Sequence, residues 1–146
     1  MDNNHWLNAL RVYVAVSAAA HFIWEVLQLP LYTIWTLGTP REIAFAVIHC
    51  TAGDVMVATL TLIAALTIAG SRDWPSQKFL HVAAITVGLG LSFTICSEWL
   101  NVVIRKSWAY SRLMPTLPGT GTGLSPLVQW IVIPLTALFL AKPRSL

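Results

Sequence analysis

The chain has 146 residues, of which 56% are apolar and only 10% are charged. A soluble domain carries about 25% charged residues, so nine basic and six acidic side chains are too few to cover one. The mean hydropathy of +0.68 agrees with this. The composition indicates a polytopic membrane protein and excludes a nucleic-acid-binding protein, a secreted disulfide scaffold and a disordered tail.

Four stretches are long and apolar enough to cross a membrane, because a helix needs about 20 apolar residues to span about 30 Å of hydrocarbon. We predict spans at residues 10–29, 43–69, 79–104 and 124–141. The predicted fold class is an all-α integral membrane protein. We expect a four-transmembrane-helix bundle that forms a single domain over residues 1–146.

The connections between the spans differ in length and character. Residues 30–42 are aromatic, residues 70–78 form a short polar turn, and residues 105–124 form one long aromatic and basic loop between the third and fourth spans. Four spans put both termini on one side. The basic residues of that side are Arg11, Arg72, Lys78, Lys142 and Arg144, and those of the other side are Arg41, Arg105, Lys106 and Arg112. Because five exceeds four, the positive-inside rule favours cytoplasmic termini in a cell (inner) membrane.

Five titratable residues lie well inside the first three spans. A charged group at mid-membrane costs about 2.5–3.5 kcal/mol, so such residues are functional candidates by default. They are His21, Glu25, His49, Asp54 and Glu98. With a rise of about 1.5 Å per residue, all five fall in the half of the membrane that faces the two aromatic loops. We therefore predict one shared polar chamber in that half.

The helical spacing of these residues supports a shared chamber. His21 and Glu25 are four residues apart and lie on one helix face. His49 and Asp54 are five apart, about 140° around a helix, so their span is predicted to address two neighbours, one through each residue. Gln129 enters the fourth span from the same side.

A buried His/carboxylate site suits acid/base chemistry on a lipophilic substrate, because a low-dielectric environment can prepare these groups as acids and bases near working pH. We assign Glu98 and Asp54 as acid/base candidates, and His21, Glu25 and His49 as their catalytic partners. The predicted substrate-binding residues are Asn101, Gln129, Trp24, Trp99 and Arg105. The predicted function is an intramembrane enzyme of the isomerase or lyase type, which acts on a membrane lipid or another lipophilic small molecule.

The His21-x-x-x-Glu25 pair, followed by the distant Glu98 and Asn101, resembles the sterol-isomerase (emopamil-binding) group of membrane proteins. The resemblance covers a handful of residues in a shorter chain with a different loop plan. No function is carried over from it.

Two alternatives stay open at this point. The first is a mononuclear or dinuclear site for a divalent metal, with less weight on haem, because two imidazoles and three carboxylates approach the ligand set of a dinuclear carboxylate centre. Its candidate ligands are His21, Glu25, His49, Asp54 and Glu98. The second is a homo-oligomeric or accessory subunit of a larger membrane complex, or part of a transport path. Cys50 and Cys96 are interpreted as packing residues.

Overall fold

The computed structural model describes residues 4–70 and 73–142. In those ranges it contains helices and no β-strand. In chain order the helices are α1 (Asn4–Gln28), the 3-10 turn η1 (Leu29–Leu31), α2 (Ile34–Leu37), α3 (Pro40–Ala69), α4 (Phe79–Glu98), the π-helical η2 (Trp99–Ile104) and α5 (Leu124–Ala141). Arg72 and Arg144, which entered the charge count, lie outside the described residues.

Four helical segments are long and apolar enough to cross a membrane: His5–Leu31, Pro40–Ala69, Phe79–Ile104 and Leu124–Ala141. The last two match the predicted spans at both ends. The first helix starts earlier than predicted, at Asn4, because the polar residues before the apolar run also adopt helical structure. The all-helical, four-span prediction is confirmed at the level of these helices, and it indicates a multi-pass membrane protein.

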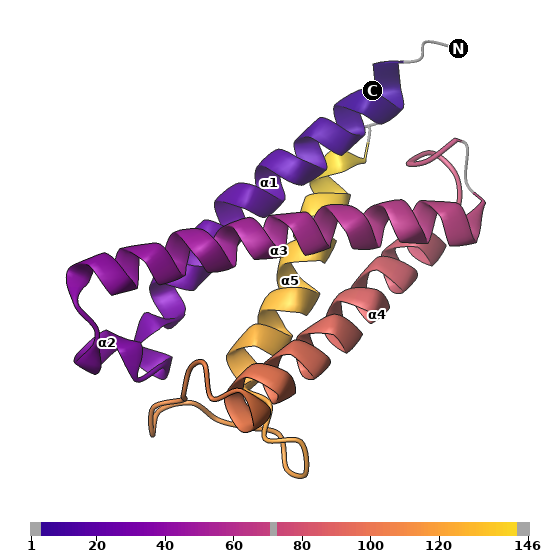
Figure 1. Ribbon diagram of the computed structural model, residues 1–146. Helices are drawn as coiled ribbons and strands as arrows, with labels where there is room; N and C mark the ends of the chain where they lie inside the picture. Colours follow the sequence, from indigo (N-terminus) through magenta and orange to yellow (C-terminus); the bar gives the residue numbers. More distant parts are fainter. Residues whose placement is uncertain (1–3, 71–72, 143–146) are drawn as a thin grey trace.

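The four long helices form a ring in which α1 packs against α3 and α5, and α4 packs against the same two neighbours (Figure 1). The start of α1 and the end of α5 lie at one end of the bundle, together with the connection between α3 and α4. At the other end α2 lies near the long loop between η2 and α5. From their connection, α3 and α4 diverge toward this second end, which we call the loop end.

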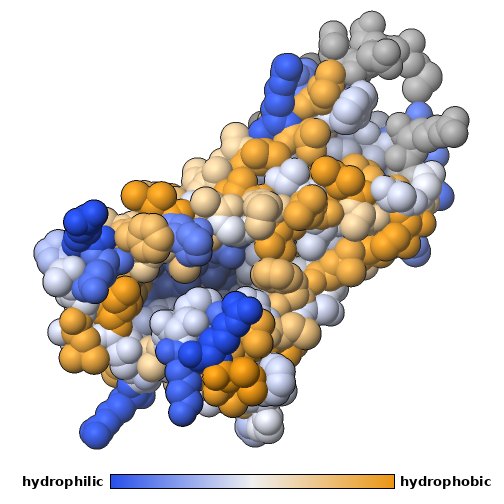
Figure 2. Space-filling view, in the orientation of Figure 1, coloured by the Kyte–Doolittle hydropathy of each residue, from blue (hydrophilic) through white to orange (hydrophobic). Residues whose placement is uncertain are grey.

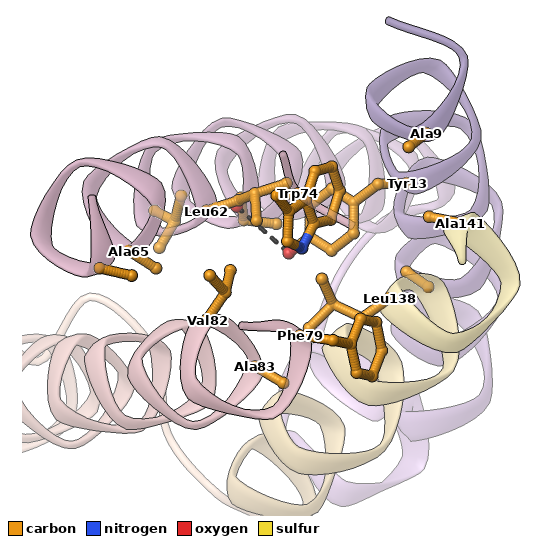
Figure 3. Packing of buried hydrophobic residues seen from close by; sticks show 14 of the residues in the cluster. Ala9, Tyr13, Leu62, Ala65, Trp74, Phe79, Val82, Ala83, Leu138 and Ala141 are labelled. Atoms are coloured by element: carbon orange, nitrogen blue, oxygen red, sulfur yellow. Dashed lines mark hydrogen bonds between the residues drawn. The ribbon is translucent and has the colours of Figure 1, made fainter. Parts of the chain in front are cut away.

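An apolar core fills the half of the bundle near the α3–α4 connection (Figure 3). Ala58, Leu62, Val82 and Leu138 are completely buried there. Small residues such as Ala58 allow helix backbones to approach closely, which is the usual basis of helix packing in membranes. The Tyr13 hydroxyl donates a hydrogen bond to the Ala58 carbonyl oxygen at 3.2 Å, which ties α1 to α3.

The loop end is closed by hydrogen bonds between the long loop and the segment that follows α1. The Thr33 amide donates to the Ala109 carbonyl at 3.0 Å, and the Ser111 amide donates to the Leu31 carbonyl at 2.9 Å. The Ser111 hydroxyl also donates to the Pro30 carbonyl at 2.9 Å. Figure 2 shows that the surface is hollowed between the first half of α3 and the end of α4, with hydrophilic side chains inside the hollow.

Candidate functional site

Gln129 of α5 is the centre of a buried polar cluster. Its amide nitrogen lies 2.8 Å from His21 Nδ1, 3.0 Å from Asp54 Oδ2 and 3.1 Å from Glu25 Oε1. His21 Nδ1 is also 3.2 Å from Asp54 Oδ2. His21 is fully buried and Gln129 is 2% exposed. The cluster therefore joins α1, α3 and α5 at one point inside the bundle.

The tautomer of His21 decides which hydrogen bonds the cluster makes. An amide nitrogen carries two hydrogens, but three possible acceptor atoms surround that of Gln129. With a hydrogen on Nδ1, His21 donates to Asp54 and Gln129 donates to Asp54 and Glu25; without it, Nδ1 accepts from Gln129 instead. His21 Nε2 is buried with no hydrogen-bond partner among the described residues.

Hydrogen bonds continue the cluster along α1 toward the loop end. Gln28 Nε2 donates to Glu25 Oε1 at 2.7 Å, and the Ser125 hydroxyl donates to Gln28 Oε1 at 2.8 Å. Trp24 Nε1 donates to the Ser125 hydroxyl at 3.2 Å. This series of hydrogen bonds reaches a surface groove of about 210 Å³ that is lined by Trp24, Leu27, Gln28, Leu31 and Ser125.

Glu98 forms a second polar group at the end of α4. It is 8% exposed, and it accepts a hydrogen bond from the Tyr110 hydroxyl. The same hydroxyl accepts a hydrogen bond from the Gly123 amide at 2.9 Å. Burial and the adjacent Glu98 raise the pKa of Tyr110 above its usual range, so the hydroxyl keeps the proton that it donates. The Tyr32 ring packs against Tyr110 with centroids 5.5 Å apart.

Electrostatic interactions connect the two groups. Glu25, Asp54 and Glu98 lie within electrostatic range of the Cys50 thiol, and Asp54 lies within electrostatic range of Glu98. Three carboxyl groups from three helices therefore lie in the same region of the bundle. The Asp54 side chain is 20% exposed. Within the described ranges the only ion pair is His21–Asp54, so no Lys or Arg neutralises these carboxyl groups.

The structure separates His49 from the cluster. Its side chain is exposed and stacks on Phe45, with ring centroids 5.4 Å apart. The prediction that His49 faces the chamber is wrong, because the rotation of about 140° that separates it from Asp54 carries it to a face of α3 that no helix covers.

Three further predicted residues lie away from the Gln129 cluster. Asn101 donates a hydrogen bond to the Ser97 carbonyl of its own helix at 2.9 Å. Trp99 is 48% exposed beside a second surface groove, and Arg105 is exposed at the end of η2.

The donor geometry gives no support to the metal interpretation. Over residues 4–70 and 73–142, no three His, Cys, Asp or Glu side chains form a group that could hold a metal ion. The amide nitrogen of Gln129 stands between His21, Glu25 and Asp54, so a hydrogen-bond donor occupies the position that a shared cation would need. A haem between His21 and His49 also lacks a basis, because His49 faces outward.

The sequence analysis missed Tyr110, Tyr32 and Ser125 as neighbours of the site. Ser125 precedes Gln129 by four residues, so helical spacing could have found it. Trp130 lies with its ring centroid 5.3 Å from that of His21. Tyr110 gave no local signal, because only the path of the long loop brings it to Glu98.

No family model, curated protein or solved structure matches this chain.

Proposed function

We propose that this protein is an intramembrane enzyme that transfers protons on a lipophilic substrate, in a chemistry of the isomerase or lyase type. The observation that carries the proposal is the His21–Asp54 pair. The Asp54 side chain of this pair is 20% exposed and has no Lys or Arg partner among the described residues. A carboxyl group that only joined helices would be expected to have a cationic partner or to be fully enclosed.

The two carboxyl groups at the hollow have complementary surroundings. Asp54 lies against His21, which orients it and can share its proton through the Nδ1–Oδ2 contact of 3.2 Å. Glu98, on a different helix, is hydrogen-bonded to a neutral tyrosine. One carboxylate removes a proton from a carbon of the substrate, and the other, as the acid, returns a proton to a second carbon. The net change is an isomerisation, so no oxidant or reductant is needed.

The remaining residues of the cluster act as positioning groups. Gln129 fixes Asp54 and Glu25 with its two amide hydrogens, and Glu25 is held in turn by Gln28. Such fixed hydrogen bonds keep acid and base groups aligned through the reaction. The charge count of the loops supports a location in the cell membrane with both termini cytoplasmic.

Deuterium incorporation tests the proposal even while the substrate is unidentified. Detergent-purified protein is incubated in D₂O with a lipid extract from the cells in which the protein occurs, and the lipids are analysed by mass spectrometry. We expect one lipid class to gain carbon-bound deuterium. Asp54→Asn and Glu98→Gln should each lower that rate by at least about 100-fold, the usual contribution of general acid–base catalysis, while the protein stays folded.

His49→Gln is the matched control, because it removes a membrane-embedded histidine that lies outside the cluster. It should keep the full rate. The proposal is wrong if no lipid gains deuterium from the folded wild-type protein, or if Asp54→Asn and His49→Gln have the same effect. Failure of Glu98→Gln to accumulate would show instead that this acid is structural.

A further inference from the structure

Four basic side chains at the loop end have no ion-pair partner in the part of the chain that the structure describes. They are Arg41, Arg105, Lys106 and Arg112, and all four are exposed. Glu42 follows Arg41 in sequence, but its carboxylate accepts hydrogen bonds from the Thr39 amide and hydroxyl, both at 2.8 Å. The loop end therefore carries an uncompensated positive charge.

Two cations at the opposite end have intramolecular partners. Lys78 Nζ donates a hydrogen bond to the Ala69 carbonyl at 2.6 Å. Lys142 Nζ lies 5.1 Å from the centre of the Phe79 ring, within the range of a cation–π interaction. Among the described residues, four cations without an intramolecular partner thus lie at the loop end, and one, Arg11, lies at the opposite end.

The backbone that carries these cations is held in place. The amides of Arg105 and Ser107 donate to the carbonyls of Leu100 and Asn101, both at 2.8 Å. Lys106 between them has a φ of 52°, a left-handed conformation that is uncommon for a residue other than glycine. Arg41 lies in the first turn of α3, between the capping-box residues Thr39 and Glu42.

Three of these cations belong to the elements that border the hollow: Arg41 lies at the start of α3, and Arg105 and Lys106 directly follow η2. Figure 2 shows strongly hydrophilic side chains on both of its borders, at the start of α3 and at the end of η2. Large apolar side chains follow on the same elements toward the membrane interior. Ile43 and Val47 lie on the same face of α3 as Asp54, and Ile104 is 56% exposed on η2. From the loop end inward, a basic rim is followed by an apolar wall and then by buried carboxyl groups. This order matches a molecule with an anionic head and an apolar chain.

We propose that the ligand of the hollow is a phosphate-bearing amphiphile, whose head is bound by Arg41, Arg105 and Lys106 and whose apolar chain extends toward Asp54. The guanidinium group is suited to this head because its planar donors bind phosphate oxygens in pairs. The inference rests on the proposed function, since it names the substrate class of the same site. The head is held at the membrane surface, while the reacting carbon lies deeper at the carboxyl groups.

Native mass spectrometry of the protein in a neutral maltoside detergent tests this inference with dodecyl phosphate as the probe. Dodecanol and inorganic phosphate are the comparison ligands, because each has only one part of the amphiphile. We expect a single adduct with dodecyl phosphate and none with the other two. Arg41→Gln and Arg105→Gln should each weaken binding about tenfold, as expected for the loss of a charge-assisted hydrogen bond.

Two variants separate the outcomes. Arg11→Gln removes an exposed cation at the opposite end and should keep the affinity. Asp54→Asn should also keep the affinity while losing deuterium incorporation, so failure of binding and failure of catalysis are distinguishable.

Equal binding of dodecanol would overturn the inference, because the alkyl chain alone would then be recognised. Several adducts, or equal losses in Arg11→Gln and Arg41→Gln, would overturn it by showing general attraction of anionic lipid to a basic surface. Binding of inorganic phosphate alone would overturn it too, by showing an anion site with no role for the chain.

Discussion

The two halves of this bundle are built from the same helices but in opposite ways. Near the α3–α4 connection the helix contacts consist of alanine, leucine and valine, and Ala58, Leu62 and Val82 are completely buried. Toward the loop end α3 and α4 diverge, and α1, α3 and α5 are joined through His21, Asp54, Glu25 and Gln129.

The difference indicates a division of labour along the bundle. Close packing of small apolar residues holds helices together in a membrane without polar groups. The half near the connection can therefore fix the bundle, while the other half holds buried carboxyl groups that contribute less to stability than apolar packing of the same volume would. Variants in each half should accordingly have different consequences for stability and for proton transfer.

The largest effect on stability is expected from Gln129→Leu. Leucine has a similar volume but no hydrogen-bond donor, so His21, Asp54 and Glu25 lose their shared partner inside the bundle. We expect a loss of about 3–5 kcal/mol in the free energy of unfolding, the range for breaking a buried polar pair. Denaturant titration in detergent, followed by circular dichroism, measures it.

Val132→Leu on the same helix is the control, because Val132 is 45% exposed. It should change the free energy of unfolding by less than about 0.5 kcal/mol. A Gln129→Leu protein as stable as the wild type would show that the cluster contributes nothing to holding α1, α3 and α5 together.

Leu62→Ala probes the apolar half. Leu62 is fully buried, so truncation leaves a cavity, and we expect a loss of about 3 kcal/mol in the free energy of unfolding. Leu60→Ala, at a position that is 57% exposed on the same helix, should cost much less. The rate of deuterium incorporation per folded molecule should stay unchanged in both variants. A selective loss of that rate in Leu62→Ala would contradict the division between the halves.

Gly90→Ala tests the contact where the two halves meet. A Cβ atom at Gly90 would lie 2.4 Å from Cε3 of Trp130, whose ring packs against His21. The indole must therefore move, and we expect a loss of about 1–3 kcal/mol in the free energy of unfolding. The tryptophan fluorescence spectrum should change with it.

Gly88→Ala is its matched control on the same helix, because a Cβ atom there has no neighbour within 4 Å. Alanine should be neutral there or stabilise the helix by up to about 1 kcal/mol. The same loss of stability in both variants would mean that helix propensity or lipid contact, rather than Trp130, determines the result.

The smallest effect is expected from Tyr110→Phe. It removes the hydrogen bonds to Glu98 and from Gly123, and should cost about 1 kcal/mol at neutral pH. The pKa of Tyr110 is raised in the folded protein, mainly by burial. Above about pH 10 the unfolded chain releases this proton while the folded protein keeps it, so the contribution of Tyr110 to stability falls as the pH rises.

The difference in unfolding midpoint between the wild type and Tyr110→Phe should therefore be smaller at about pH 11 than at about pH 8. Tyr32 is present in both proteins, so its own titration largely cancels. A difference that is equal at both pH values would show that the Tyr110 proton is not held more tightly in the folded state.

The helices and part of the site could be predicted from the sequence. Apolar runs of span length define the four long helices, and the spacing of His21 and Glu25 places both on one face of α1. The helical rise placed His21, Glu25 and Asp54 in one half of the membrane, with Gln129 entering from the same side, and the structure joins these four residues.

Other features of the site depend on helix rotation and on the path of a loop. His49 has the same residue type and nearly the same depth as His21, but the rotation of α3 places it outside the bundle. Gln129 was expected to hold substrate, whereas its position between three helices makes it the donor of the cluster.

By itself the sequence determined that this chain has four helices long and apolar enough to span a membrane and that its buried acids gather in one half of them, because length, hydropathy and helical rise are local properties. Only the tertiary structure decided that Tyr110 reaches Glu98, that His49 faces away, and that the basic residues at the start of α3 and the end of η2 border one hollow. The physical reason is that these relations depend on the rotation and divergence of packed helices, which the contacts of the whole bundle set together.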